Sequence, residues 1–140
     1  MSEKDGLEVG GYAEPLWIMN VDARWLSHIL DGNKTVEVRK NDPEKRGRVK
    51  KDDILYIENS ESTINACFRV KDVRIYPDLN TMLITEGLRN VLPGVKTLEE
   101  AREIYNTIDG TDVTSVVKRM REYEKYGLIV IELGVKIRYW

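Results

Sequence analysis

The sequence has little of what metal centres and disulfides require. Its 140 residues include one cysteine, Cys67, and one histidine, His28. A single cysteine excludes an internal disulfide and is typical of a reducing compartment. Because structural zinc sites use four cysteine or histidine ligands, a conventional zinc site is nearly excluded. The sequence therefore predicts no metal and no cofactor.

Long apolar runs are also missing. No segment approaches the roughly 18 consecutive apolar residues that a transmembrane helix needs. The first residues, MSEKDGLEVGGYAEP, are acidic and polar, unlike a signal peptide or a basic targeting sequence. We therefore expect a flexible N-terminal tail over residues 1–14 and no membrane partner. The expected location is the cytoplasm, and the nucleus stays open.

The remaining composition is that of one soluble, globular domain. Hydrophobic residues make up 41% of the sequence and charged residues 33%, and this length is enough to bury a core. The formal net charge of −2 argues against a protein that coats nucleic acid. We expect a single domain over residues 15–140.

Positive charge is concentrated in one segment. Between residues 34 and 51 there are eight basic and three acidic residues, a local charge of +5. Asn, Asp, Pro and Gly in the stretch KNDPEKRGRVKKDD indicate a loop. Such a loop would attract phosphate groups. The alternative is a solvated charged loop that binds nothing.

The stretch DGNKTVEVRK joins a glycine that can end a helix to an alternating pattern. Val36 and Val38 alternate with functional side chains, which predicts a strand whose valines face the core. Lys34, Glu37 and Arg39 would then either line a pocket or lie on a solvated edge. The spacing alone leaves that choice open.

Hydrophobic periodicity predicts a mixture of strands and helices. Strands are expected at 15–21, 35–39, 54–58, 63–76 and 128–140, and helices at 23–30, 79–88, 97–108 and 112–126. The alternation slips after Val70, which indicates a bulge, and Gly134 is expected to break the last strand. Several curved strands with helices inserted before the last one favour an α+β fold on a small, partly closed mixed β-barrel.

Aromatic residues divide into two groups. Trp17 and Trp25 lie among apolar residues and are expected in the core. Tyr56, Tyr76 and Trp140 are candidate surfaces on which bases could stack. The alternative for these three is ordinary packing in the core or at its edge.

The helix expected over 112–126 combines an apolar stripe with a basic face. The stripe consists of Val113, Val116, Val117 and Met120. The basic face consists of Lys118, Arg119, Arg121 and Lys125. This face could meet an acidic protein partner.

Three ordered segments resemble the ASCH domain, a relative of the PUA domain. ILDGNKTVEVR, followed by VKKDDILYI, is similar to the family's helix, Gly-x-Lys, strand ending in Arg, and turn into a strand. The family's Gly-Asp-like turn is replaced here by Asp52-Asp53. YPDLNTMLITEGLRNVLPGVKTLEEAREIY and YGLIVIEL resemble later family segments. The resemblance spans roughly residues 16–135 and implies a PUA-like β-barrel with flanking helices.

The resemblance also implies a cleft lined by Lys34 and Arg39. Relatives are associated with RNA binding and with coactivator proteins. Some small bacterial members are amidohydrolases of N4-acylated cytidines, which use a lysine, a threonine on the following strand and a downstream glutamate. Lys34 matches that lysine, Glu37 stands where the threonine is expected, and Glu86 is a candidate for the downstream carboxylate.

Our leading hypothesis is the binding of RNA or a modified nucleobase in a basic cleft. The candidate binding residues are Lys34, Thr35, Glu37, Arg39, Lys40, Arg46, Arg48, Lys50 and Lys51. The alternative is a metal-independent amidohydrolase acting on an N4-acylated cytidine or a similar small nucleoside. Its catalytic residues would be Lys34, Glu37 and Glu86. A carboxylate at position 37 favours protonated Lys34, and therefore binding over proton abstraction. A third hypothesis is an interaction module that uses the 112–126 helix.

Overall fold

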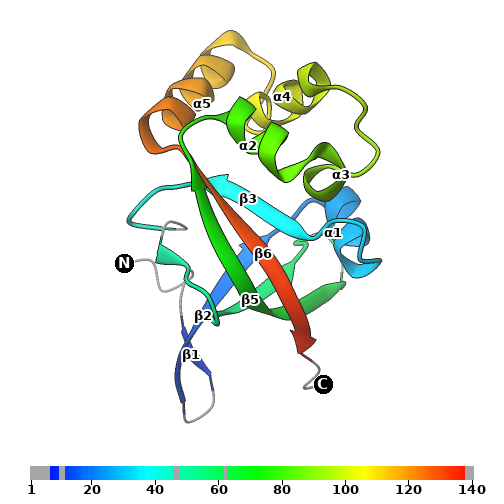
Figure 1. Ribbon diagram of the computed structural model, residues 1–140, viewed down its shortest axis with the longest axis vertical. Coiled ribbons are helices and arrows are strands. Elements are labelled where there is room, and N and C mark those ends of the chain that lie inside the picture. Colours follow the sequence, from blue (N-terminus) through cyan, green and yellow to red (C-terminus); the bar gives the residue numbers. More distant parts are fainter. Residues whose placement is uncertain (1–6, 10–11, 46–47, 62, 138–140) are drawn as a thin grey trace.

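The computed structural model describes residues 7–9, 12–45, 48–61 and 63–137 (Figure 1). The strands within these ranges are β1 (Leu7–Val9), β2 (Tyr12–Asn20), β3 (Val36–Lys40), β4 (Ile54–Glu58), β5 (Asn65–Tyr76) and β6 (Leu128–Ile137). The helices are α1 (Ala23–Leu30), α2 (Leu79–Glu86), α3 (Leu88–Val91), α4 (Leu98–Asn106) and α5 (Val113–Tyr126). None of these described helices is long and apolar enough to cross a membrane.

The strands form one curled sheet in the order β1-β2-β4-β5-β6-β3. Its strand pairs are antiparallel except β2 with β4, which are parallel. The pairing of β5 with β6 shifts register on both sides of Val70, which confirms the predicted bulge. A bulge increases local twist and bends a strand, so it helps the two longest strands to curl the sheet. The predicted α+β class, with a partly closed mixed barrel, is confirmed.

Two hydrophobic clusters lie on the two faces of β6. Ile129 and Ile131 belong to a cluster that includes Leu26 and Ile29 of α1. Leu128 and Val130 face a second cluster, formed with α2, α3, α4 and α5. Figure 1 shows these four helices gathered over one end of the sheet. Because both faces of β6 are buried, its sequence LIVI is a continuous apolar run rather than an alternating one.

Side-chain caps fix the starts of the predicted helices. The carboxylate of Asp22 accepts a hydrogen bond from the Arg24 amide at the start of α1. The hydroxyl of Thr97 accepts one from the Glu100 amide at the start of α4. Both caps satisfy amides that a helix leaves without an internal partner.

Gly134 does not break the last strand, which corrects the sequence prediction. Strand β6 continues through it to Ile137. A Cβ at this position would lie 2.8 Å from the carbonyl oxygen of Arg69 in β5. The glycine therefore allows the two backbones to approach closely beside the bulge.

The apolar stripe predicted for α5 is not packed against the domain. Val113 is 78% exposed, Val117 is 37% exposed and Met120 is 45% exposed. The helix instead packs through the side that carries Tyr123, which is buried in the second cluster. The predicted helix is present, but a helix pattern shows which residues share a side and not which side meets the core.

Several smaller expectations have mixed outcomes. Trp17 is buried as predicted, whereas Trp25 is only half-buried. Strand β1 pairs with β2 inside the stretch expected to be a flexible tail. Residues 1–6 and 10–11 of that stretch, and Trp140, lie outside the described residues.

Candidate functional site

A cleft of about 640 Å³ lies where β3 comes close to the junction of β2 and α1. Its lining comes from that junction, from β3 and the loop after it, and from α4 and α5. The basic residues of the lining are Arg24, Lys34, Arg39, Lys40, Lys45 and Arg119, and the acidic ones are Asp22, Glu37 and Asp42. The aromatic residues are Trp25, Tyr105 and Tyr123.

The floor of the cleft is a buried row of alternating charges. The Lys34 ammonium donates a hydrogen bond to the carbonyl oxygen of Val91 at 2.5 Å and lies 3.5 Å from Glu37 Oε1. The other oxygen of Glu37 is 2.6 Å from the Arg39 guanidinium. Lys34 is only 3% exposed and Glu37 only 7%. One carboxylate is thus held between two cations, with only a small part of its surface exposed to the cleft.

Burial and ion pairing shift the pKa values of Lys34 and Glu37 in opposite directions. Burial lowers the pKa of Lys34, and the carboxylate of Glu37 only partly restores it. Burial alone would raise the pKa of Glu37, but Arg39 and Lys34 together outweigh it and hold that pKa below its usual range. Glu37 is therefore ionised at neutral pH and can only accept hydrogen bonds.

Arg39 also ties together two strands that are not neighbours in the sheet. Its guanidinium donates to the carbonyl oxygen of Asn20, at the end of β2, at 2.9 Å. Strand β3 is the edge strand beyond β6, so this contact crosses the open side of the sheet. The Arg39 side chain keeps 27% of its surface exposed, so it reaches the cleft as well.

The turn after α1 explains why Lys34 points inward. Gly32 takes a positive φ of 81°, and the next two amides donate to the carbonyl oxygen of His28. Thr35 then bonds through its amide to the Asn90 carbonyl. The chain enters β3 with Val36 in the second hydrophobic cluster and the charged floor facing the cleft.

The walls of the cleft carry aromatic rings and cations, and only some of these cations are already paired with a carboxylate. The Arg24 guanidinium lies 4.2 Å from the ring centre of half-buried Trp25. The Arg119 guanidinium contacts Asp109 at 2.7 Å. Within the described part of the chain, Arg24 and Lys45 form no ion pair, and both side chains are exposed. These two cations at the rim are available to an anionic ligand.

Comparison with known proteins identifies the family. The sequence profile of the ASCH domain matches residues 19–134. The chain belongs to the ASCH domain family. A search of curated proteins found no match to this ASCH domain.

Solved structures share the fold of this ASCH domain. The crystal structure of hypothetical protein PH0355 is 31% identical, covers 87% of this chain and 99% of its own, and has a TM-score of 0.70. The solution structure of protein PF0455 from Pyrococcus furiosus is also 31% identical, covers 89% and 99%, and has a TM-score of 0.64. A mutant ZmASCH protein from Zymomonas mobilis is 14% identical, covers 84% and 66%, and has a TM-score of 0.54. The PUA-like fold expected from the sequence is thereby confirmed.

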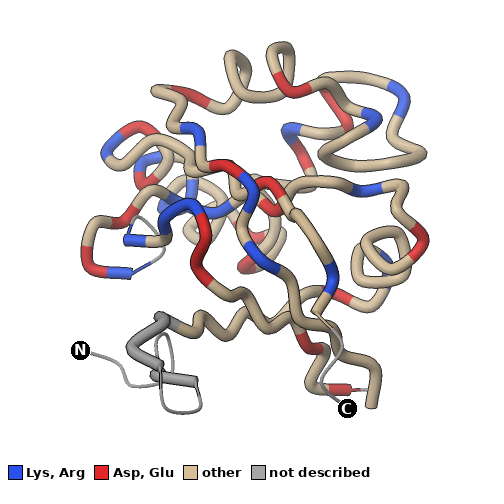
Figure 2. The backbone as a smooth tube through the Cα atoms, turned by 60° about the horizontal axis from the view of Figure 1, so that its bottom comes forward, with Lys and Arg blue, Asp and Glu red and all other residues tan. Residues whose placement is uncertain are grey.

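The ASCH domain brings some of the predicted binding residues together and separates others. Lys34, Glu37, Arg39 and Lys40 line the cleft, and the Lys40 ammonium contacts Glu122 of α5 at 3.1 Å. Thr35 lies in a separate depression beside His28 and Asn90. Arg48, Lys50 and Lys51 are exposed but do not line the cleft, and Arg46 lies outside the described residues. Figure 2 shows basic and acidic positions interspersed along much of the backbone.

Glu86 is not among the residues that line the cleft, so the structure does not join it to Lys34. Both of its oxygens accept hydrogen bonds from the Arg74 guanidinium, at 2.7 and 2.8 Å. The Tyr76 hydroxyl donates to it as well, which occupies a side chain predicted as a stacking surface. This network fastens the end of α2 to β5. The resemblance suggested Glu86 as the downstream carboxylate, but its position along the chain does not show whether it reaches the cleft.

This network should make part of the protein's stability sensitive to acid. The Arg74 guanidinium holds the pKa of Glu86 below its usual range. A carboxylate with a depressed folded-state pKa stabilises the fold above its unfolded pKa of about 4.3, and that contribution disappears as pH falls through the folded value. We expect Glu86→Gln to be destabilising at pH 7 and less destabilising at pH 3, below the unfolded-state pKa, as measured by urea unfolding. An unchanged difference at the two pH values would contradict this assignment.

Sequence reasoning missed several residues of the cleft. Arg24 and Trp25 precede the recognised motif, and Tyr105 and Arg119 follow it by more than 60 positions. The available clue for Trp25 was its place at the border of the apolar face of α1. The others come together only through the way α4 and α5 fold over β3. Among the described residues, no group of three His, Cys, Asp or Glu side chains could hold a metal ion.

Proposed function

We propose that this ASCH domain binds RNA by taking an unpaired base into the cleft. The observation that carries the proposal is the position of Glu37, an ionised hydrogen-bond acceptor at the floor, below a rim of exposed cations. A simple anion would leave the acceptor oxygens of Glu37 without a donor from the ligand. A neutral base alone would not use the rim. A nucleotide offers N–H donors at one end and a phosphate at the other, and matches both.

The size and walls of the cleft support the same class of ligand. Its volume of about 640 Å³ lies within the roughly 300–1,000 Å³ of small-molecule sites. Half-buried Trp25 supplies flat apolar surface, and base–aromatic stacking contributes about 1–3 kcal/mol per base. Single-stranded RNA is favoured over a duplex because its bases can leave the stack and enter a pocket.

The rim predicts how binding depends on salt. We expect the double variant Arg24→Ala with Lys45→Ala to bind single-stranded RNA about tenfold more weakly at low salt. The slope of log affinity against log salt should fall by about 1.4, because each lost phosphate contact removes roughly 0.7. Fluorescence anisotropy with a labelled mixed-sequence RNA at several salt concentrations measures both quantities.

The matched control removes two cations that do not line the cleft. Lys50→Ala with Lys51→Ala changes the net charge by the same amount, in exposed positions of the neighbouring loop. Its affinity and salt slope should stay close to those of the unmodified protein. If the two double variants weaken binding equally, RNA is held by general charge and the cleft proposal fails.

A second candidate function is hydrolysis of an N4-acylated cytidine, and one observation favours it. Burial lowers the pKa of Lys34, which is one way in which a lysine becomes able to accept a proton. Incubating N4-acetylcytidine with a high concentration of the protein tests this chemistry. Release of cytidine and acetate that is lost in Glu37→Gln would support an enzyme. A lack of product would leave the cleft as a binding site.

A further inference from the structure

The outward side of α5 carries an apolar stripe that nothing in the described structure covers. Val117 follows Val113 by four residues, and Met120 follows Val117 by three. The three residues therefore lie along one side of the helix. All three are exposed. Single exposed aliphatic residues are ordinary, but a continuous stripe on one helix is typical of a contact surface.

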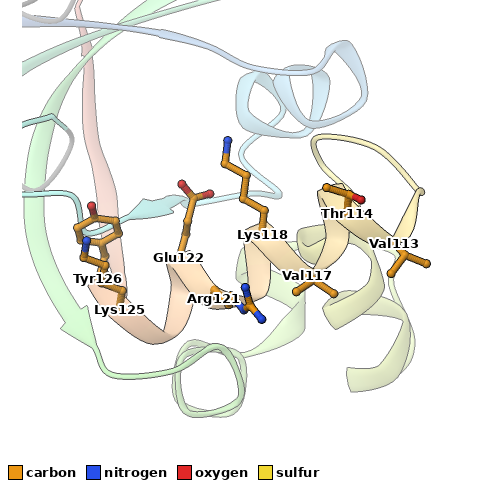
Figure 3. Close-up of a pocket in the computed structure, with 8 residues that line it drawn as sticks. All are labelled: Val113, Thr114, Val117, Lys118, Arg121, Glu122, Lys125 and Tyr126. Carbon is orange, nitrogen blue, oxygen red and sulfur yellow. The ribbon is translucent and has the colours of Figure 1, made fainter.

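Cations lie beside this stripe. A groove of about 540 Å³ runs along α5 and includes Val113 and Val117 together with Lys118, Arg121 and Lys125. Figure 3 shows Arg121 following Val113 and Val117 along the helix, whereas Lys118 projects from the opposite side of the helix. Within the described residues, Lys118 and Arg121 form no ion pair. The groove also includes Glu122, but its carboxylate contacts Lys40.

We propose that this surface of α5 docks an acidic, amphipathic segment of a protein partner. The aliphatic stripe would bury the partner's apolar side chains, and the neighbouring cations would pair with its carboxylates. Protein interfaces commonly have such an apolar centre with charged residues at the rim. An amphipathic helix with anchors at positions i, i+4 and i+7 fits the spacing of Val113, Val117 and Met120. The proposal does not depend on RNA binding in the cleft.

The chemistry of this surface favours a protein over an RNA strand. Surfaces that hold single-stranded nucleic acid combine cations with aromatic rings for stacking. Here the centre of the surface is aliphatic. The one ring in the groove, Tyr126, has the Lys125 ammonium 5.1 Å from its centre. This surface carries three free or weakly held cations beside valines and a methionine. It therefore complements a partner segment that carries carboxylates beside leucines.

A designed peptide provides the test. The probe is a fluorescein-labelled helical peptide with leucines at i, i+4 and i+7 and glutamates on both flanks. We expect it to bind at least about tenfold more tightly than a scrambled peptide of the same composition. A third peptide with lysine in place of each glutamate should not bind. Anisotropy with the full chain measures all three.

Surface variants locate the binding. Val113→Ser with Val117→Ser should weaken binding of the acidic peptide by about tenfold or more. The double variant Lys118→Glu with Arg121→Glu should no longer bind the acidic peptide and should bind the lysine peptide instead, because the charge complementarity is reversed. Two matched controls should leave binding unchanged: Ile84→Ser, at an exposed aliphatic residue of α2, and Lys50→Glu with Lys51→Glu in the loop.

Four results would overturn the proposal. Equal binding of the ordered and scrambled peptides would mean that charge alone acts. Equal loss in the control variants would place the contact elsewhere. RNA binding that weakens in the α5 charge variants, with no peptide binding, would assign the surface to nucleic acid. Self-association that disappears in Val113→Ser with Val117→Ser, measured by sedimentation, would assign it to a second copy of this chain.

Discussion

Replacing Lys34 by methionine should lower the free energy of unfolding by about 3 kcal/mol. Breaking a buried ion pair by removing one partner generally costs about 3–5 kcal/mol, since the other charge is left without compensation. The value here should lie at the lower end because Arg39 still contacts Glu37 at 2.6 Å. Methionine fills a similar volume, so the loss reports the missing charge and the unsatisfied Val91 carbonyl rather than an empty cavity.

The neighbouring strand residue Lys40 provides the matched control. Its ammonium also contacts a glutamate, at 3.1 Å, but both side chains of that pair are 26% exposed. Partly solvated pairs contribute about 0–1 kcal/mol, so Lys40→Met should change stability by that amount at most. Urea unfolding followed by circular dichroism gives both values under identical conditions.

A double variant separates the charge effect from lost packing. Glu37→Gln removes the buried carboxylate that has lost one of its two cationic partners in Lys34→Met. The combination should therefore be less damaging than the sum of the two single changes. Coupling energies between contacting residues are about 0.5–3 kcal/mol. Simple additivity would mean that Lys34 stabilises the fold by packing, and the charged floor described above would lose its main support.

The floor of the cleft is also the part of the site that sequence predicts best. Alternation places Val36 on one face of β3 and Glu37 on the other, because successive side chains of a strand point in opposite directions. The helix stop at Gly32 positions Lys34 two residues before the same strand. These are local rules, acting over ten residues, and the structure follows them closely.

The rest of the site depends on contacts between distant segments. Trp25 and Arg119 are separated by more than 90 residues, and they line one cleft because α5 packs against β3 and the same cleft also reaches α1. The apolar stripe of α5 is a second case in which the sequence does not determine a tertiary contact. Its period predicts a helix correctly, but only tertiary packing decides whether Val113 or Tyr123 faces the core.

The ionised state of Glu37 leads to the second large prediction, a preference among bases. A carboxylate that only accepts hydrogen bonds favours a base that presents N–H groups. Guanine presents its N1–H and its amino group side by side, one for each carboxylate oxygen. Uracil presents one N–H between two carbonyl oxygens, which the carboxylate repels. We therefore expect guanine nucleotides to bind most tightly and uracil nucleotides least.

Competition against the labelled RNA measures this preference. Guanosine monophosphate should compete about tenfold more effectively than inosine monophosphate, which lacks only the amino group, because one well-placed contact to a base contributes about 1–3 kcal/mol of discrimination. In Glu37→Gln the difference between guanine and uracil should shrink, since an amide both donates and accepts. The variant must first show the same circular dichroism spectrum as the unmodified protein.

Asp42→Asn is the matched control, because Asp42 also lines the cleft but lies in the exposed loop after β3. Removing its charge should strengthen the binding of all nucleotides by a similar factor and leave their order unchanged. Equal affinities for guanosine, inosine and uridine monophosphates, with the effects of Arg24 and Lys45 intact, would show that the cleft holds only the phosphate. In that case Glu37 would hold Lys34 and Arg39 in place without contacting the base.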